Sequence, residues 1–114
     1  LTTNRLAPGE SAAVIAYRTA LERWPDSLGA SVALANLYYA QGNLKDTEVT
    51  LRRASERHPD SVVVLNNLAQ TLSDEGRDAE ALSLIERAGQ PDPKYAAAVA
   101  ETRALIVQRL EKKK

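Results

Sequence analysis

This chain of 114 residues contains no cysteine, no methionine and no phenylalanine, and aromatic residues make up only 4% of it. Without cysteine, disulfides, thiolate nucleophiles and cysteine-bound metals are all excluded. With so few aromatic side chains, the core must consist mainly of alanine, leucine and valine. Because protein interiors are closely packed, a core of small residues favours close contact between helices over a roomy ligand cavity.

The chain also lacks an excess of either charge, since 15 basic residues balance 15 acidic ones. A nucleic-acid partner would require a basic excess or a basic stripe, so we predict none. No apolar run reaches the roughly 20 residues needed to span a bilayer, so we predict no membrane span. The absence of cysteine fits the cytoplasm and the periplasm equally well, which leaves the compartment open. A first residue that is not methionine suggests a fragment of a longer protein.

The strongest positive feature is an interval of 34 residues. Pro25, Pro59 and Pro93 are separated by this interval, and other positions repeat with them. The repeated positions include Ala20, Ala54 and Ala88, Gly42 and Gly76, Leu34 and Leu68, and Ala35 and Ala69. A period of this length indicates one supersecondary unit stacked on copies of itself. Stacked repeats offer extended surfaces, so we expect binding rather than catalysis.

Between the prolines, apolar residues recur with the period of an α-helix. Ser27 and Ser61 suit N-caps, and Gly42 and Gly76 suit the left-handed residue that closes a helix. We predict about six helices, near residues 10–24, 27–41, 44–57, 61–75, 81–88 and 95–112. The predicted units are a ragged segment (1–9), the second helix of a partial repeat (10–26), two full repeats (27–60 and 61–93) and a capping helix (94–114).

The pattern resembles the tetratricopeptide repeat, a helix–turn–helix unit of this period. The resemblance depends on Leu34, Ala35, Tyr38, Gly42, Leu51, Ala54 and Pro59 in the first full copy, and on Leu68, Ala69, Leu72, Gly76, Ala81, Ile85, Ala88 and Pro93 in the second. Two departures are clear: Ser31 and Leu65 replace the family's common tryptophan, and Thr47 replaces a small alanine. The resemblance implies an all-α, right-handed helical-repeat stack.

Residues for catalysis are scarce. His58 is the only histidine, and it takes the place that Trp24 has one repeat earlier, so we interpret it as a helix-end residue. A catalytic nucleophile requires a base close by, and the single histidine is in a structural position. The acidic residues around Gly76 lack the spacing of a calcium-binding loop. We therefore predict no enzymatic activity, no metal and no cofactor. The final lysines, 112–114, are interpreted as a frayed, solvated end.

In tetratricopeptide proteins the first helix of each unit lines a concave groove that holds partner peptides. The resemblance places seven residues on this face: Val32, Asn36, Tyr39, Asn66, Asn67, Gln70 and Ser73. Side-chain amides donate and accept hydrogen bonds, so they can bind an extended peptide backbone without requiring a charge. Tyr39 would add a rigid amphipathic contact. The resemblance thus implies a protein-binding adaptor or scaffold whose partner is a peptide or a helix.

Two alternatives stay open. Residues 16–36 are similar to C-terminal repeats of bacterial papain-like peptidases, which implies an accessory domain of a larger bacterial enzyme. The second alternative is self-assembly, because an incomplete stack exposes apolar helix faces that can pair with another copy. Leu105, Ile106, Val107 and Leu110 give the last helix more apolar surface than a cap requires. This alternative implies a homo-oligomer formed through the end helices.

Overall fold

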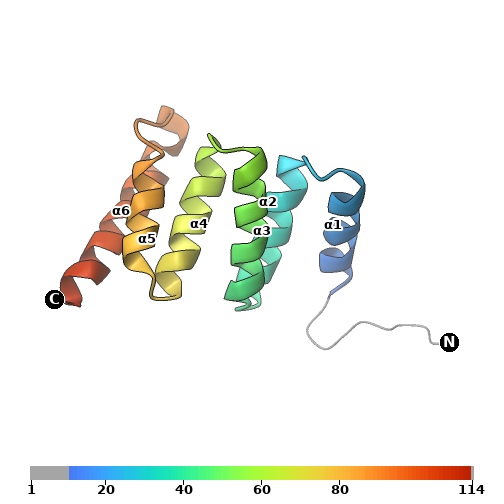
Figure 1. The fold of residues 1–114 in the computed structure, drawn as a ribbon, viewed down its shortest axis with the longest axis horizontal. Coiled ribbons are helices and arrows are strands. Elements are labelled where there is room, and N and C mark those ends of the chain that lie inside the picture. Colours follow the sequence, from blue (N-terminus) through green and yellow to red (C-terminus); the bar gives the residue numbers. More distant parts are fainter. Residues whose placement is uncertain (1–10, 114) are drawn as a thin grey trace.

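The structure is a computed structural model that describes residues 11–113, so the segment predicted for residues 1–9 lies outside the described residues. The described chain forms α1 (Ala12–Arg23), α2 (Leu28–Ala40), α3 (Leu44–Arg57), α4 (Val62–Asp74), α5 (Asp78–Glu86) and α6 (Pro93–Lys112). These helices stand side by side in chain order (Figure 1). The predicted all-α repeat stack is confirmed. None of the described helices is both long and apolar enough to cross a membrane.

The ends of the inner helices follow the predicted signals. The Ser27 hydroxyl accepts a hydrogen bond from the Ala30 amide at 3.1 Å, and the Ser61 hydroxyl accepts one from the Val64 amide at 3.3 Å. At the other end, Gly42 and Gly76 have φ angles of 76° and 85°, a region that favours glycine. Both full units therefore begin at a serine cap and turn at a left-handed glycine.

The outermost helices differ slightly from the prediction. α1 begins at Ala12 because Ser11 is its N-cap and accepts a hydrogen bond from the Val14 amide. α6 begins at Pro93 rather than at residue 95. Proline has no amide hydrogen and a fixed φ, so it is well suited to the first turn of a helix. The difference at each end is about one or two residues.

The apolar core consists of two clusters. The larger one joins α2 to α6 and is formed by Ala35, Leu51, Leu65, Leu68, Ala69, Leu72, Ala81, Leu84, Ile85, Val99 and Ile106. The smaller one contains Val14 of α1 with Leu34 and Tyr38 of α2. Thr47 is buried among these helices, and its hydroxyl donates to the Asn43 carbonyl at 2.8 Å. This bond satisfies the polar atom that replaces the family's alanine.

One prediction about α1 was wrong. The sequence predicts Ala13, Tyr17, Ala20 and Leu21 as its apolar side. Leu21 does pack against the core, but Tyr17 is 39% exposed and Val14 is fully buried. α2 packs against the side of α1 that carries Val14 and Leu21. The side that carries Tyr17 therefore faces away from the stack.

Candidate functional site

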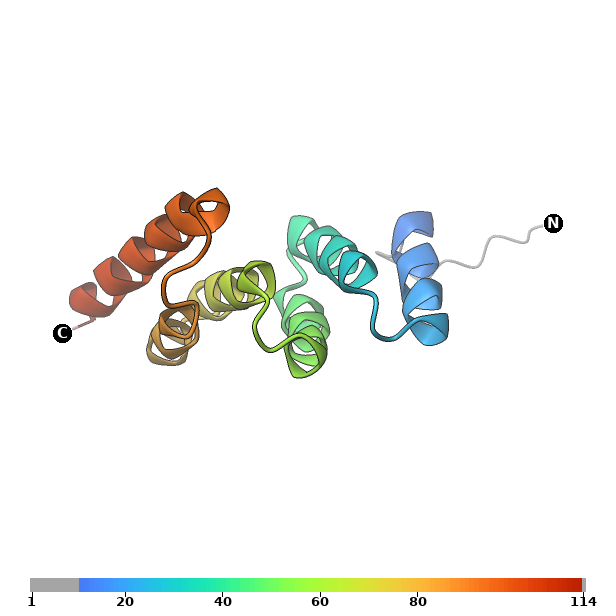
Figure 2. The same cartoon turned by 90° about the horizontal axis from the view of Figure 1, so that it is seen from above.

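The first helices of the units form one side of the molecule. Figure 2 shows α2 and α6 on that side and α3 and α5 on the other, with α4 between α2 and α6. Residues of α2 and α4 face each other across the space between these two helices, and α3 closes it from below. This is the position that the sequence predicted for a groove.

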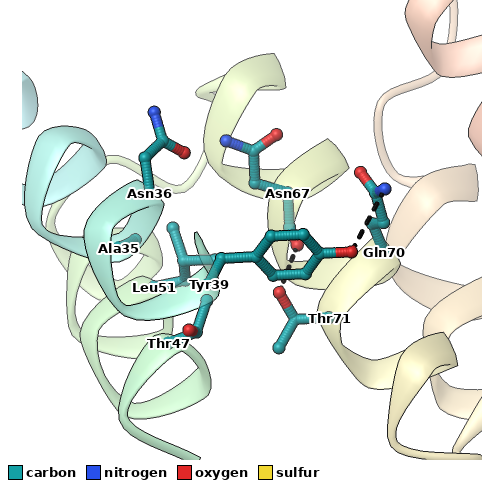
Figure 3. Close-up of a pocket in the computed structure, with 8 residues that line it drawn as sticks. All are labelled: Ala35, Asn36, Tyr39, Thr47, Leu51, Asn67, Gln70 and Thr71. Atoms are coloured by element: carbon teal, nitrogen blue, oxygen red, sulfur yellow. Dashed lines mark hydrogen bonds between the residues drawn. The ribbon is translucent and has the colours of Figure 1, made fainter. Parts of the chain in front are cut away.

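A small pocket lies where α2, α3 and α4 meet. Its volume is about 70 Å³, and it is lined by Ala35, Asn36, Tyr39, Thr47, Leu51, Asn67, Gln70 and Thr71. In Figure 3 the amides of Asn36 and Asn67 lie on one side of the Tyr39 ring, and Thr47 and Thr71 lie on the other. The Thr71 hydroxyl donates to the Asn67 carbonyl at 2.8 Å. The pocket thus has a largely apolar floor below a rim of side-chain amides.

Tyr39 connects α2 to α4 at this pocket. Its hydroxyl donates a hydrogen bond to Asp74 Oδ2, and the Gln70 amide donates to the same hydroxyl at 3.5 Å (Figure 3 shows the Gln70 bond). The bond to Asp74 raises the pKa of Tyr39, and partial burial of the ring adds to this rise. Tyr39 therefore remains a neutral hydrogen-bond donor at physiological pH.

Arg109 of α6 extends this polar network, and the sequence interpretation did not include it. One of its guanidinium nitrogens, Nη1, donates to Asp74 Oδ1 at 2.9 Å and to Ser73 Oγ at 2.8 Å. The Ser73 hydroxyl in turn donates to Asp78 Oδ1 at 2.5 Å, and Ser73 is only 3% exposed. Ser73 was predicted to lie on the concave surface, but it is buried with its hydroxyl engaged by α5 and α6.

Lys113, one of the final lysines predicted to form a frayed, solvated end, is 52% exposed yet bonded to the neighbouring turn. Its ammonium group donates to Asp78 Oδ2 and to the Gly76 carbonyl, the latter at 2.9 Å. Burial alone would raise the pKa of Asp78, but the hydrogen bonds from Lys113 and Ser73 outweigh it and lower this pKa. Asp78 is therefore ionised, and it anchors the end of α6 to the turn between α4 and α5.

The seven predicted site residues fall into two groups. Four of them, Asn36, Tyr39, Asn67 and Gln70, come together at the pocket. The other three, Val32, Asn66 and Ser73, do not line it; Val32 and Asn66 are half-buried on α2 and α4. The Asn66 Oδ1 atom is buried and has no hydrogen-bond partner within residues 11–113.

Two features of residues 11–113 bear on metal and acid–base chemistry, namely the grouping of the acidic side chains and the surroundings of the single histidine. No group of three or more His, Asp or Glu side chains in this range is arranged to hold a metal ion. His58 Nε2 lies 2.8 Å from the Asp26 carbonyl oxygen, and Arg57 forms a 2.6 Å ion pair with the Asp26 carboxylate. These contacts join two equivalent turns, so His58 serves as a helix-end residue.

Comparison with known proteins agrees with this geometry. One family model described as Tetratricopeptide repeat matches residues 11–64, and a second with the same description matches residues 62–88. A search of curated proteins gave no match to the chain. The two family matches together cover α1 to α5, including both serine-capped units and the pocket between them. The chain belongs to the tetratricopeptide repeat family.

Proposed function

We propose that the concave side of this chain binds an extended segment of a partner protein, with Asn36, Tyr39, Asn67 and Gln70 as the contact residues. Tetratricopeptide repeats generally mediate protein–protein interaction. The observation that supports this particular site is the pocket between α2 and α4, where amide side chains surround an apolar floor.

The rim of the pocket has unused hydrogen-bonding capacity. Within the described part of the chain, no group bonds to the side-chain amides of Asn36 or Asn67. An extended peptide presents one amide hydrogen and one carbonyl at nearly every residue, and a side-chain amide can pair with both. Asn36 and Asn67 can therefore hold a partner's backbone whatever its sequence.

The floor of the pocket supplies selectivity. Its volume of about 70 Å³ is well below the roughly 300–1,000 Å³ of sites that enclose drug-sized molecules. The space suits one small uncharged side chain of a bound peptide rather than a free metabolite. Asp74 lies nearby, but Arg109 neutralises it. A charged partner residue is therefore not required at this point.

A capture experiment with two matched triple variants tests the proposal. The groove variant combines Asn36→Ala, Asn67→Ala and Gln70→Ala. The control combines Arg53→Ala, Ser83→Ala and Glu56→Ala, three exposed residues on α3 and α5. A specific partner captured by the wild type should be lost by the groove variant and retained by the control. Equal retention by both variants would overturn the assignment of this face.

We also propose that the chain has no catalytic role of its own. Its single histidine is held at the Asp26 carbonyl, and the sequence has no cysteine. Within residues 11–113, neither ring nitrogen of His58 forms a hydrogen bond with a serine or threonine hydroxyl. If the chain acts within a larger bacterial enzyme, it would act by binding.

A further inference from the structure

α1 carries an unusual amount of exposed apolar surface. Among the described residues the large exposed apolar side chains are Tyr17, Trp24 and Tyr39, at 39%, 59% and 38%. Two of these three lie on α1 or at its C-cap. Tyr17 shares one side of the helix with three alanines, Ala13, Ala16 and Ala20, which are three or four residues apart or adjacent to it. We call these four residues the outer face of α1.

The internal repeat shows what this face does elsewhere in the chain. The residues 34 and 68 positions later are Thr47, Thr50, Leu51 and Ala54 on α3, and Ala81, Leu84 and Ile85 on α5 with Ala88 just after it. All of these are buried except Ala88, which is half-buried. α3 packs between α2 and α4, and α5 packs between α4 and α6, whereas the main contact of α1 among the described helices is α2. The outer face of α1 is therefore a helix-binding surface that no described helix covers.

Helix α6, at the opposite end of the stack, is a poor partner for this face if two copies stack end to end. α6 occupies the place of a first helix, and its residue equivalent to Ala35 and Ala69 is Arg103. Arg103 is exposed, and its Nε donates to Glu86 at 2.8 Å. A long charged side chain stands where α2 and α4 have a methyl group. Stacking of α1 from one copy on α6 of another would bury this ion pair, so end-to-end growth is disfavoured.

We propose that the outer face of α1 binds the same face of a second copy, forming a two-fold symmetric dimer. Such an interface requires a self-complementary surface. Tyr17 meets this requirement, because small residues lie four positions before it and three after it, where the partner's ring can insert. Trp24 at the C-cap of α1 is a second exposed aromatic side chain, and Arg23 lies over its ring at 5.1 Å. Tyrosine, tryptophan and arginine are the residues that contribute most often to binding energy at interfaces.

Charge and size set the expected strength. The outer face carries no charge, and the chain has a formal net charge of zero, so no long-range repulsion separates two copies. However, stable interfaces bury about 1,200–2,000 Å² in total, more than one pair of 12-residue helices provides. The dimer should therefore form in the micromolar range or at higher concentrations, in exchange with the monomer.

Sedimentation equilibrium and the fluorescence of Trp24 test this proposal on the whole chain. The mass should rise from 12.4 kDa towards twice that value with concentration, and no further. Because Trp24 is the only tryptophan, its emission should shift to shorter wavelength over the same concentration range. A mass of 12.4 kDa at every concentration would overturn the proposal and leave the face to a helix of another protein. Continued growth beyond the dimer would overturn the two-fold arrangement.

Two tyrosines with nearly equal exposure provide a matched pair of variants. Tyr17→Ser should weaken dimerisation at least tenfold, whereas Tyr39→Ser, on the concave side, should leave it unchanged. Equal weakening by both would show that the outer face is not the interface. Ala16→Glu is a second disruptive variant, which places a charge on an exposed position of the same face. Circular dichroism of each variant distinguishes loss of association from loss of helix.

Discussion

Tyr39 on α2 donates a hydrogen bond to Asp74 on α4, 35 residues further along the chain. The same separation joins Asp74 to Arg109 and Asp78 to Lys113. Each pair spans one repeat plus one residue, so polar side chains connect corresponding turns of adjacent units. Together with the apolar core, these bonds connect α2 to α4, α4 to α6, and α5 to the end of α6.

The link between Tyr39 and Asp74 predicts a change in tyrosine ionisation. Asp74→Asn removes the negative charge that opposes the phenolate, so the pKa of Tyr39 should fall towards its ordinary value. The measurement is an ultraviolet titration, with Tyr39→Phe identifying which of the four tyrosines is responsible. The free energy of unfolding should change by less than about 1 kcal/mol, because the bond is exposed. An unchanged titration curve in Asp74→Asn would contradict the assignment.

Substitution by alanine should change the stability of the fold in opposite directions at Gly76 and at Gly29. Gly76→Ala places a side chain at a φ of 85°, so it should destabilise the fold by about 1 kcal/mol. Gly29 lies within α2, and a β-carbon there would meet nothing within 4 Å. Gly29→Ala should therefore stabilise the fold by about 0.5–1 kcal/mol through higher helix propensity. Thermal unfolding followed by circular dichroism gives both values, and a shift of the same sign in both would refute the argument.

The core between the two full units should be the most sensitive to truncation. Leu68 is 1% exposed and belongs to the larger cluster, so Leu68→Ala should cost about 2–5 kcal/mol. Leu28 is only half-buried at the start of α2, and Leu28→Ala should cost distinctly less. Urea unfolding of the two variants provides the comparison. Similar midpoints for both would mean that Leu68 does not occupy the centre of the core.

Glu75 should make stability depend on pH. Burial raises its pKa, and repulsion from Glu48 adds to the rise. Oε1 of each carboxylate is buried without a hydrogen-bond partner within residues 11–113. Because the pKa is higher in the folded state, the contribution of Glu75 to stability is present at acidic pH and is lost as pH rises through that folded pKa. Ionised Glu75 is therefore a cost at neutral pH.

Replacing Glu75 should remove that cost. Glu75→Gln should stabilise the fold at about pH 7 by on the order of 1 kcal/mol, and should have little effect at about pH 4. Glu56→Gln, at an exposed position of α3, serves as the control and should change stability at neither pH by more than about 0.5 kcal/mol. Chemical denaturation at the two pH values checks both variants. If Glu75→Gln stabilises the fold equally at both pH values, the ionisation of Glu75 is not the cause.

Most of the fold could be predicted because its signals are local and repeated. Ser27 and Ser61 cap helices through their own hydroxyls, and Gly42 and Gly76 adopt the backbone that glycine allows. Each signal acts within a few residues and occurs in both units. The exposed side of α1 could not be predicted in this way, because burial depends on which neighbouring helix is present.

The polar network was missed because its members are distant in sequence and common in type. Arg109 and Lys113 look like ordinary basic residues near a helix C-terminus. Their acidic partners, Asp74 and Asp78, lie 35 residues earlier in the sequence. A search for opposite charges at this interval would have found both pairs. The family register places Asn36, Tyr39, Asn67 and Gln70 on the first helices, where they line the pocket. Ser73 is buried instead, because Asp78 of α5 and Arg109 of α6 bond to its hydroxyl.

The division of the core has a consequence for how the molecule opens. α1 is held to the rest mainly through Val14 and its contact with Leu34 and Tyr38, while α3 to α6 share the larger cluster. Local opening requires only that the contacts of the opening segment be lost, so detaching α1 needs less free energy than unfolding the whole chain. Amide hydrogens of α1 should therefore exchange with solvent well before those of α4. We therefore expect this chain to unfold from one end, with α1 detaching while the pocket between α2 and α4 is still intact.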